Sequence, residues 1–238
     1  MTATPALQPY RMPSLMRKFI RRTAISLALV GALLFGGAGT LNWPAAWLYL
    51  ALAFAISFGA GSWLARNDPA LLSERLGSLF QREQKGWDKA LMAVMLTLWA
   101  GWLILIGLDR RYHGSDVPLA VRGIGLALIV LGSYVVGVTL KANSYAAPVV
   151  KIQKARGHTV VTTGPYAYVR HPMYAGAFLL IAGMPLMLGS WWGLAAGLGL
   201  VIIIAIRAVF EERTLAAELE GYAEYAARVR HRFVPCLW

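Results

Sequence analysis

The sequence has 238 residues, of which 58% are hydrophobic and only 14% are charged, and its mean hydropathy is +0.56. A disordered segment or an ordinary soluble domain is much less apolar, so the composition indicates a membrane protein. The formal net charge of +12 suits either a nucleic acid or an anionic membrane surface as partner. Because the basic residues lie between long apolar runs and form no compact basic domain, we exclude nucleic acid.

Six apolar segments have about the length of a membrane-spanning helix, which needs roughly 17 to 25 residues. Only Gly189 and Ser190 separate the last two, which predicts a tight helical hairpin with Trp191 and Trp192 as interfacial anchors. We therefore predict an all-α fold, a polytopic membrane helix bundle of about six transmembrane helices. The segments lie near residues 23–39, 44–65, 90–108, 119–140, 173–188 and 191–209.

The whole chain, residues 1–238, is expected to form one domain, because no linker or internal repeat divides it. Within it, residues 1–140 would supply N-terminal transmembrane helices and residues 141–238 the functional region. The single cysteine, Cys236, excludes an internal disulfide or a paired-cysteine metal site, and we expect no metal centre. Its position third from the end also fails to match a CaaX prenylation signal.

The distribution of basic residues predicts the orientation, since Lys and Arg accumulate in cytoplasmic loops. Five lie before the first span, five in 66–89, five in 141–170 and five from Arg207 onward. The remaining three are Arg110, Arg111 and Arg122. Both termini and the long loops are therefore expected in the cytoplasm. A cleavable signal peptide is the alternative for the first span, but its removal would leave an odd number of helices, so we expect a retained helix.

The first polar region, Gln153 to Gly176, combines breaks with aromatic and basic side chains. Gly157 and Gly164-Pro165 are turn signals, and His171-Pro172 predicts a helix start with proline in its first turn. The free N–H groups of such a start suit a carboxylate or another anion. An interfacial belt of Tyr and Arg is the alternative reading, although it accounts less well for the breaks.

The second polar region runs from Arg207 to Arg232. Arg207 and Glu211 share one face of a helix near the membrane boundary, where ionisable groups line a cavity or pair with each other. Further along, apolar residues recur at helical spacing and predict a C-terminal amphipathic helix that covers a site. Because the two polar regions flank the final hairpin, its folding should bring them together.

These two regions resemble the isoprenylcysteine carboxyl methyltransferase family and its bacterial relatives, part of a wider group with the phospholipid N-methyltransferases. The resemblance extends from Gly157 to Val229. Its motifs are Gly157-His158-Thr159-Val160-Val161, Thr163-Gly164-Pro165-Tyr166, Arg170-His171-Pro172-Met173-Tyr174, Arg207 with Glu211-Glu212, and Tyr222 with Tyr225 before Arg228-Val229.

The resemblance implies a membrane enzyme that uses S-adenosyl-L-methionine, releases S-adenosyl-L-homocysteine and has its cofactor site on the cytoplasmic side. Arg207 and Glu211 would be catalytic, and Arg207 and Glu212 would contact a lipid-like or prenylated acceptor that enters from the bilayer. The residues that would hold the cofactor are Gln153, His158, Thr159, Val160, Val161, Tyr166, His171, Pro172, Met173, Tyr174 and Glu211.

The sequence leaves the methyl acceptor open. A carboxylate of an isoprenylcysteine-like or other lipophilic molecule is the leading hypothesis, because it needs a cation such as Arg207 and no general base. An amino phospholipid would need a base such as Glu212 or His171, and a small thiol would react as its thiolate. An NADPH-dependent membrane reductase and a scaffold or transporter subunit are the alternatives outside this class. The sequence predicts a multi-pass protein of the bacterial inner membrane, with no indication of its oligomeric state.

Overall fold

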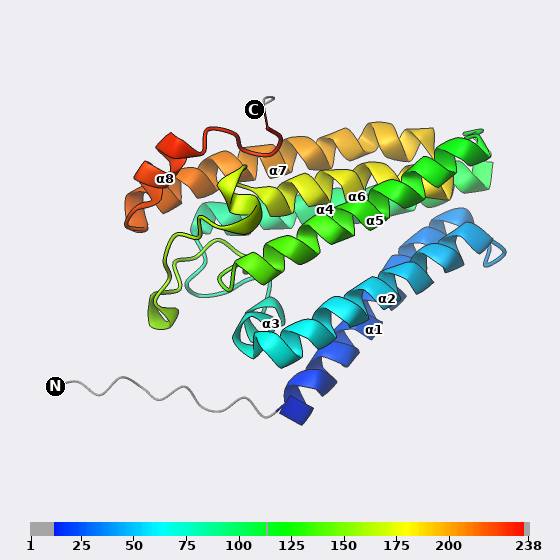
Figure 1. Cartoon of the computed structure of the whole chain (residues 1–238). Helices are drawn as coiled ribbons and strands as arrows, with labels where there is room; N and C mark the ends of the chain where they lie inside the picture. Colours follow the sequence, from blue (N-terminus) through cyan, green and yellow to red (C-terminus); the bar gives the residue numbers. More distant parts are fainter. Residues whose placement is uncertain (1–11, 113, 236–238) are drawn as a thin grey trace.

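The computed structural model describes residues 12–112 and 114–235, and this part of the chain is helical with no strand (Figure 1). Arg11 and Cys236 lie outside the described residues. Six long helices form the bundle, and four short elements lie between or after them. The elements are α1 (Met12–Ala38), α2 (Pro44–Asn67), α3 (Pro69–Arg75), α4 (Gly86–Tyr112), α5 (Leu119–Ala142), η1 (Lys154–Arg156), η2 (Gly164–Ala167), α6 (Pro172–Leu188), α7 (Trp191–Glu218) and α8 (Tyr222–Arg228).

Five of the long helices, α1, α2, α4, α5 and α7, are long and apolar enough to cross a membrane. The sixth, α6, is apolar but has 17 residues, about 25 Å at 1.5 Å per residue against a hydrocarbon core of roughly 30 Å. The polytopic helical bundle is confirmed. About six transmembrane helices were expected. Five helices are long enough to cross a membrane, and α6 is a shorter helix alongside α5 and α7 (Figure 1).

The outward faces of the bundle carry large apolar side chains, as expected for contact with lipid tails rather than water. Between 50 and 63% of the side-chain surface is exposed at Phe54, Val130, Ile202 and Leu198. The short connections between α1 and α2, α4 and α5, and α6 and α7 all lie at one end of the bundle in Figure 1. The long loops, α3 and α8 lie at the other end, so polar chain gathers at a single face.

The α5–α6 pair is the most extensive helix contact among the described residues, and glycines let the two backbones approach closely. A Cβ on Gly132 would lie 2.7 Å from the carbonyl oxygen of Gly176, and a Cβ on Gly176 would lie 2.9 Å from that of Gly132. Gly125 and Gly183 face each other in the same way, one heptad along each helix. This packing fixes the start of α6, where His171 is the N-cap and Pro172 the first residue.

Replacing Gly132 with alanine should therefore destabilise the bundle by about 1–3 kcal/mol, the usual cost of inserting a methyl group into a filled contact. Gly137→Ala on the same helix is the matched control, because nothing lies within 4 Å of its added Cβ. Thermal unfolding in detergent should show a lower midpoint for Gly132→Ala and an unchanged or higher one for Gly137→Ala. Equal midpoints would contradict the close packing.

Candidate functional site

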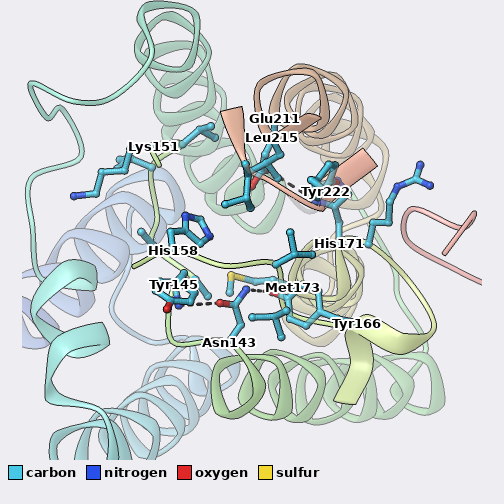
Figure 2. A pocket seen from close by; sticks show the side chains of 18 of the residues that line it. Asn143, Tyr145, Lys151, His158, Tyr166, His171, Met173, Glu211, Leu215 and Tyr222 are labelled. Atoms are coloured by element: carbon cyan, nitrogen blue, oxygen red, sulfur yellow. Dashed lines mark hydrogen bonds and ion pairs between the residues drawn. The ribbon is translucent and has the colours of Figure 1, made fainter. Parts of the chain in front are cut away.

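A pocket opens at the end of the bundle that carries the long loops, and five parts of the chain contribute to it (Figure 2). They are the end of α3, the loop from the end of α5 through residue 161, η2 with the start of α6, the last turns of α7, and α8. The lining residues are Arg75, Asn143, Tyr145, Ala146, Ala147, Pro148, Val149, Val150, Lys151, His158, Thr159, Val160, Val161, Tyr166, Arg170, His171, Met173, Tyr174, Arg207, Glu211, Leu215, Leu219, Tyr222 and Tyr225.

A buried ion pair and a tyrosine link α4, α6 and α7 beneath this pocket. Arg207 Nε donates to Asp88 Oδ1 at 2.7 Å, and both side chains are almost completely buried. Arg207 Nη1 donates to the Tyr174 hydroxyl at 2.7 Å, and that hydroxyl donates to Glu211 Oε2 at 2.6 Å. The predicted proximity of Arg207 and Glu211 is thus real, but Tyr174 bridges them.

The same pair fixes one wall of the pocket. Asp88 Oδ2 accepts the backbone N–H of Val150 at 2.9 Å, and Arg207 Nη2 donates to the carbonyl oxygen of Pro148 at 3.0 Å. Two charged side chains from the helices therefore position the backbone of the loop that follows α5.

Asp88→Asn should lower the unfolding free energy by about 3 kcal/mol, because it leaves the Arg207 charge buried without its counter-charge. Asp116→Asn is the control, since Asp116 is exposed at the opposite end of the bundle. Chemical denaturation in detergent measures both. An Asp88→Asn protein as stable as the control would show that the pair does not hold the fold.

Glu212 organises a second polar cluster beside the pocket. Its carboxylate accepts from Arg170 Nε at 2.7 Å, from His171 Nε2 at 3.1 Å and from Arg232 Nε at 3.0 Å. The backbone N–H groups of Arg170 and His171 also donate to the carbonyl oxygens of His231 and Arg232. The start of α6, the end of α7 and the C-terminal segment are therefore tied together.

The stacked rings of Tyr145 and His158 form the opposite wall, which Figure 2 shows across the hollow from Glu211 and Tyr222. The His158 and Tyr145 rings stack with their centroids 4.4 Å apart. Gly157, which precedes His158, has a φ of +63°, a left-handed conformation that glycine adopts without strain. Burial and the nearby Arg156 lower the pKa of His158, while Glu211 opposes the shift, so the imidazole is neutral at neutral pH.

His158 should make the fold less stable in mild acid. Its folded pKa lies below the unfolded value of about 6.5, so its contribution is complete above pH 6.5 and is lost as the pH falls toward the folded pKa. Between pH 7.5 and 5.5, the melting temperature of the wild type should fall further than that of His158→Gln. Parallel pH profiles would contradict this role.

The C-terminal helix differs from its prediction. Instead of one continuous amphipathic helix, α7 ends at Glu218, Gly221 adopts a φ of +80°, and α8 begins at Tyr222. The break turns α8 back over the pocket, where the Tyr225 hydroxyl donates to the Tyr166 carbonyl oxygen at 2.8 Å. Burial raises the pKa of Tyr225 to about 12, so its phenol stays protonated at neutral pH.

Comparison with known proteins identifies the family. A family model described as phospholipid methyltransferase matches residues 121–220. The cobalt-zinc-cadmium resistance protein CzcN of Cupriavidus metallidurans is 31% identical over 168 residues, 69% of this chain and 70% of that protein. The protein-S-isoprenylcysteine O-methyltransferase of Rattus norvegicus is 32% identical over 113 residues, 44% of this chain and 38% of the rat protein. The chain belongs to the isoprenylcysteine methyltransferase-like family.

Membership establishes a membrane methyltransferase at modest sequence identity. The family match covers most of α5 together with the pocket loop, α6 and α7, which supply most of the pocket lining; α3 and α8 lie outside it. The match to the Schizosaccharomyces pombe protein-S-isoprenylcysteine O-methyltransferase is 34% over 67 residues, 28% of each chain. This chain thus spans well under half the length of its eukaryotic relatives.

Most residues that the family resemblance suggested for the site lie in the pocket. Three do not line it. Gln153 is buried within the loop, where its side chain donates to the Tyr145 carbonyl oxygen and accepts from Arg156. Pro172 is buried in the first turn of α6. Glu212 lies in the polar cluster beside the pocket and not in the pocket lining. Those that line the pocket are His158, Thr159, Val160, Val161, Tyr166, His171, Met173, Tyr174, Arg207 and Glu211.

Sequence reasoning missed the contributions of Asp88, Arg75, Asn143 and Tyr145. Asp88 lies just before the predicted span at 90–108, where an acidic residue in the first turn of a helix is ordinary, so the sequence did not indicate its burial. Asn143 donates to the Tyr166 hydroxyl at 2.9 Å, and nothing in its sequence context indicates that contact. Arg75 lies in the half of the chain that carries no family motif.

Proposed function

We propose that this methyltransferase transfers a methyl group from S-adenosyl-L-methionine to the carboxylate of an isoprenylcysteine-like or other lipophilic acceptor, at the boundary between membrane and cytoplasm. One observation supports this most strongly. Ten residues that the family resemblance suggested for cofactor and acceptor, from the loop, η2, α6 and α7, line a single pocket.

The chemistry of the pocket fits such a cofactor. Glu211 lies in the lining with one carboxylate oxygen held by Tyr174, and a carboxylate suits the cationic and hydroxyl groups of this cofactor. Val160, Leu215 and Leu219 supply apolar surface for a flat ring system.

The residues of the chain have to align the two reactants and exclude water. S-adenosyl-L-methionine supplies an electrophilic methyl group on a sulfonium. The α8 cover and the apolar residues around it form the cluster Leu219, Tyr222 and Tyr225, which shields one side of the pocket from solvent. The Asp88–Arg207 pair holds Tyr174, and Tyr174 holds Glu211, so the carboxylate is pre-positioned rather than mobile.

A carboxylate acceptor would also need no general base. It is already ionised at neutral pH, whereas an ammonium must first lose a proton. Glu212, the candidate base for amine methylation, is engaged by two arginines and a histidine. Burial raises the pKa values of Tyr166 and Tyr222, so these phenols are not bases at neutral pH either.

We infer from the distribution of basic residues that the loop-bearing end faces the cytoplasm of a bacterial cell, with the protein in the inner membrane. The cofactor would enter from the water side, and a lipid-like acceptor would enter from the bilayer. The two kinds of reactant would then meet at the one polar face of the bundle.

Glu211→Gln tests the cofactor site with a small change of shape. Isothermal titration of the detergent-purified wild type with S-adenosyl-L-homocysteine should show saturable binding, and Glu211→Gln should weaken it at least about tenfold, as expected for hydrogen bonds to a charged group. Glu220→Gln, an exposed position after the end of α7, is the matched control. A well-folded wild type that does not bind this product would sink the proposed function.

A further inference from the structure

The cations around the pocket are not equivalent. Four Lys or Arg residues line it: Arg75, Lys151, Arg170 and Arg207. Three of them have a carboxylate partner at ion-pair distance, with 2.8 Å between Lys151 and Glu74, 2.7 Å between Arg170 and Glu212, and 2.7 Å between Arg207 and Asp88. Their charges are already balanced by the protein.

Arg75 is the exception. Its Nη1 donates to the carbonyl oxygen of Ala146 at 2.8 Å and approaches Met173 Sδ at 3.9 Å, and both acceptors are neutral. Within residues 12–112 and 114–235, no carboxylate forms an ion pair with it. A guanidinium has five N–H donors and keeps its charge in proteins, so donors and a net charge remain for a ligand.

The short helix α3 holds Arg75 firmly. Asp68 caps it by accepting the N–H of Leu71 at 2.9 Å, and Pro69 occupies its first position. Leu71 and Leu72 are almost completely buried in a cluster with α1, α2 and α5. Arg75 at the end of α3 is thus placed by a rigid element rather than by a loop.

The surroundings of Arg75 suit an anion. Met173, which it contacts, lies in the first turn of α6, where the helix dipole also favours negative charge. Burial lowers the pKa of Arg75, which indicates the cost of a charge without a counter-ion. A bound carboxylate would remove that cost.

We propose that Arg75 binds the carboxylate of the methyl acceptor, while Arg207, balanced by Asp88, positions Tyr174 and Glu211. The inference rests on the proposed function and names the residue that recognises the substrate. The cofactor carries a carboxylate of its own, so the experiment must separate the two sources.

Binding of N-acetyl-S-farnesyl-L-cysteine and of its methyl ester tests the proposal, because the two probes differ in the carboxylate charge. Titrations in detergent with S-adenosyl-L-homocysteine present should show that the wild type prefers the acid at least about tenfold. Arg75→Gln should lose that preference, and Arg75→Lys should keep part of it. Arg22→Gln is the matched control, because Arg22 is half-buried, donates to the Gly77 carbonyl oxygen and does not line the pocket.

The outcomes are distinguishable. The proposal is overturned if Arg75→Gln still prefers the acid. It is also overturned if the wild type binds S-adenosyl-L-homocysteine but binds the two farnesyl probes equally well, or binds neither of them. If Arg75→Gln instead weakens binding of S-adenosyl-L-homocysteine measured alone, Arg75 holds the cofactor carboxylate and the acceptor assignment is wrong. Failure of the wild type to bind S-adenosyl-L-homocysteine would count against the proposed function itself.

Discussion

The ion pair between Asp88 and Arg207 is the interaction on which the site depends. Isolated charges inside an apolar bundle are costly, and this pair is tolerated because each charge has a partner and further hydrogen bonds. Those extra bonds reach Tyr174 on α6 and the backbone at Pro148 and Val150. The hydrogen bonds that make the buried charges tolerable therefore also position the pocket loop and α6. Through Tyr174 they position the Glu211 carboxylate as well.

The two ends of the bundle differ because polar chain segments are costly to bury among apolar helices. Short turns close the helices at one end, and the long polar segments within residues 12–112 and 114–235 lie at the other (Figure 1). Gly132 and Gly176 let α5 and α6 approach closely, so that the N-terminus of α6 opens into the polar end. The proposed transfer to a lipophilic acceptor would use this end as the place where water-soluble and lipid-like reactants meet.

Much of this architecture could be predicted from the sequence because hydropathy, proline and glycine act locally. Each of the six predicted apolar segments is a helix, of which five are long enough to cross a membrane and α6 is shorter, and His171-Pro172 marks the start of α6 as predicted. The turn at Gly189-Ser190 was equally clear, since Gly189 has a φ of +84° and Ser190 caps α7. Because the two polar regions flank this hairpin, the sequence also predicted that they would meet.

Long-range contacts account for what the sequence did not reveal. Asp88 and Arg207 are 119 positions apart, and no local pattern pairs them. The helical spacing of apolar residues continues across Gly221, so periodicity alone predicted one helix where the chain makes α7 and α8. Arg75 lines the pocket because the fold brings its side chain at the end of α3 against Met173 at the start of α6. Gln153 does not line the pocket, because its side-chain amide donates to the Tyr145 carbonyl oxygen within the loop.

The proposed function requires that the loop after α5, the start of α6 and the end of α7 with α8 bind the cofactor together as one pocket. Hydrogen–deuterium exchange of the detergent-purified protein, with and without S-adenosyl-L-homocysteine, tests it most directly. With the product bound, exchange should be slower in residues 145–161, 166–174 and 211–225 and unchanged in residues 39–43 and 189–193. Protection confined to the opposite end of the bundle, or to only one of the three segments, would contradict it.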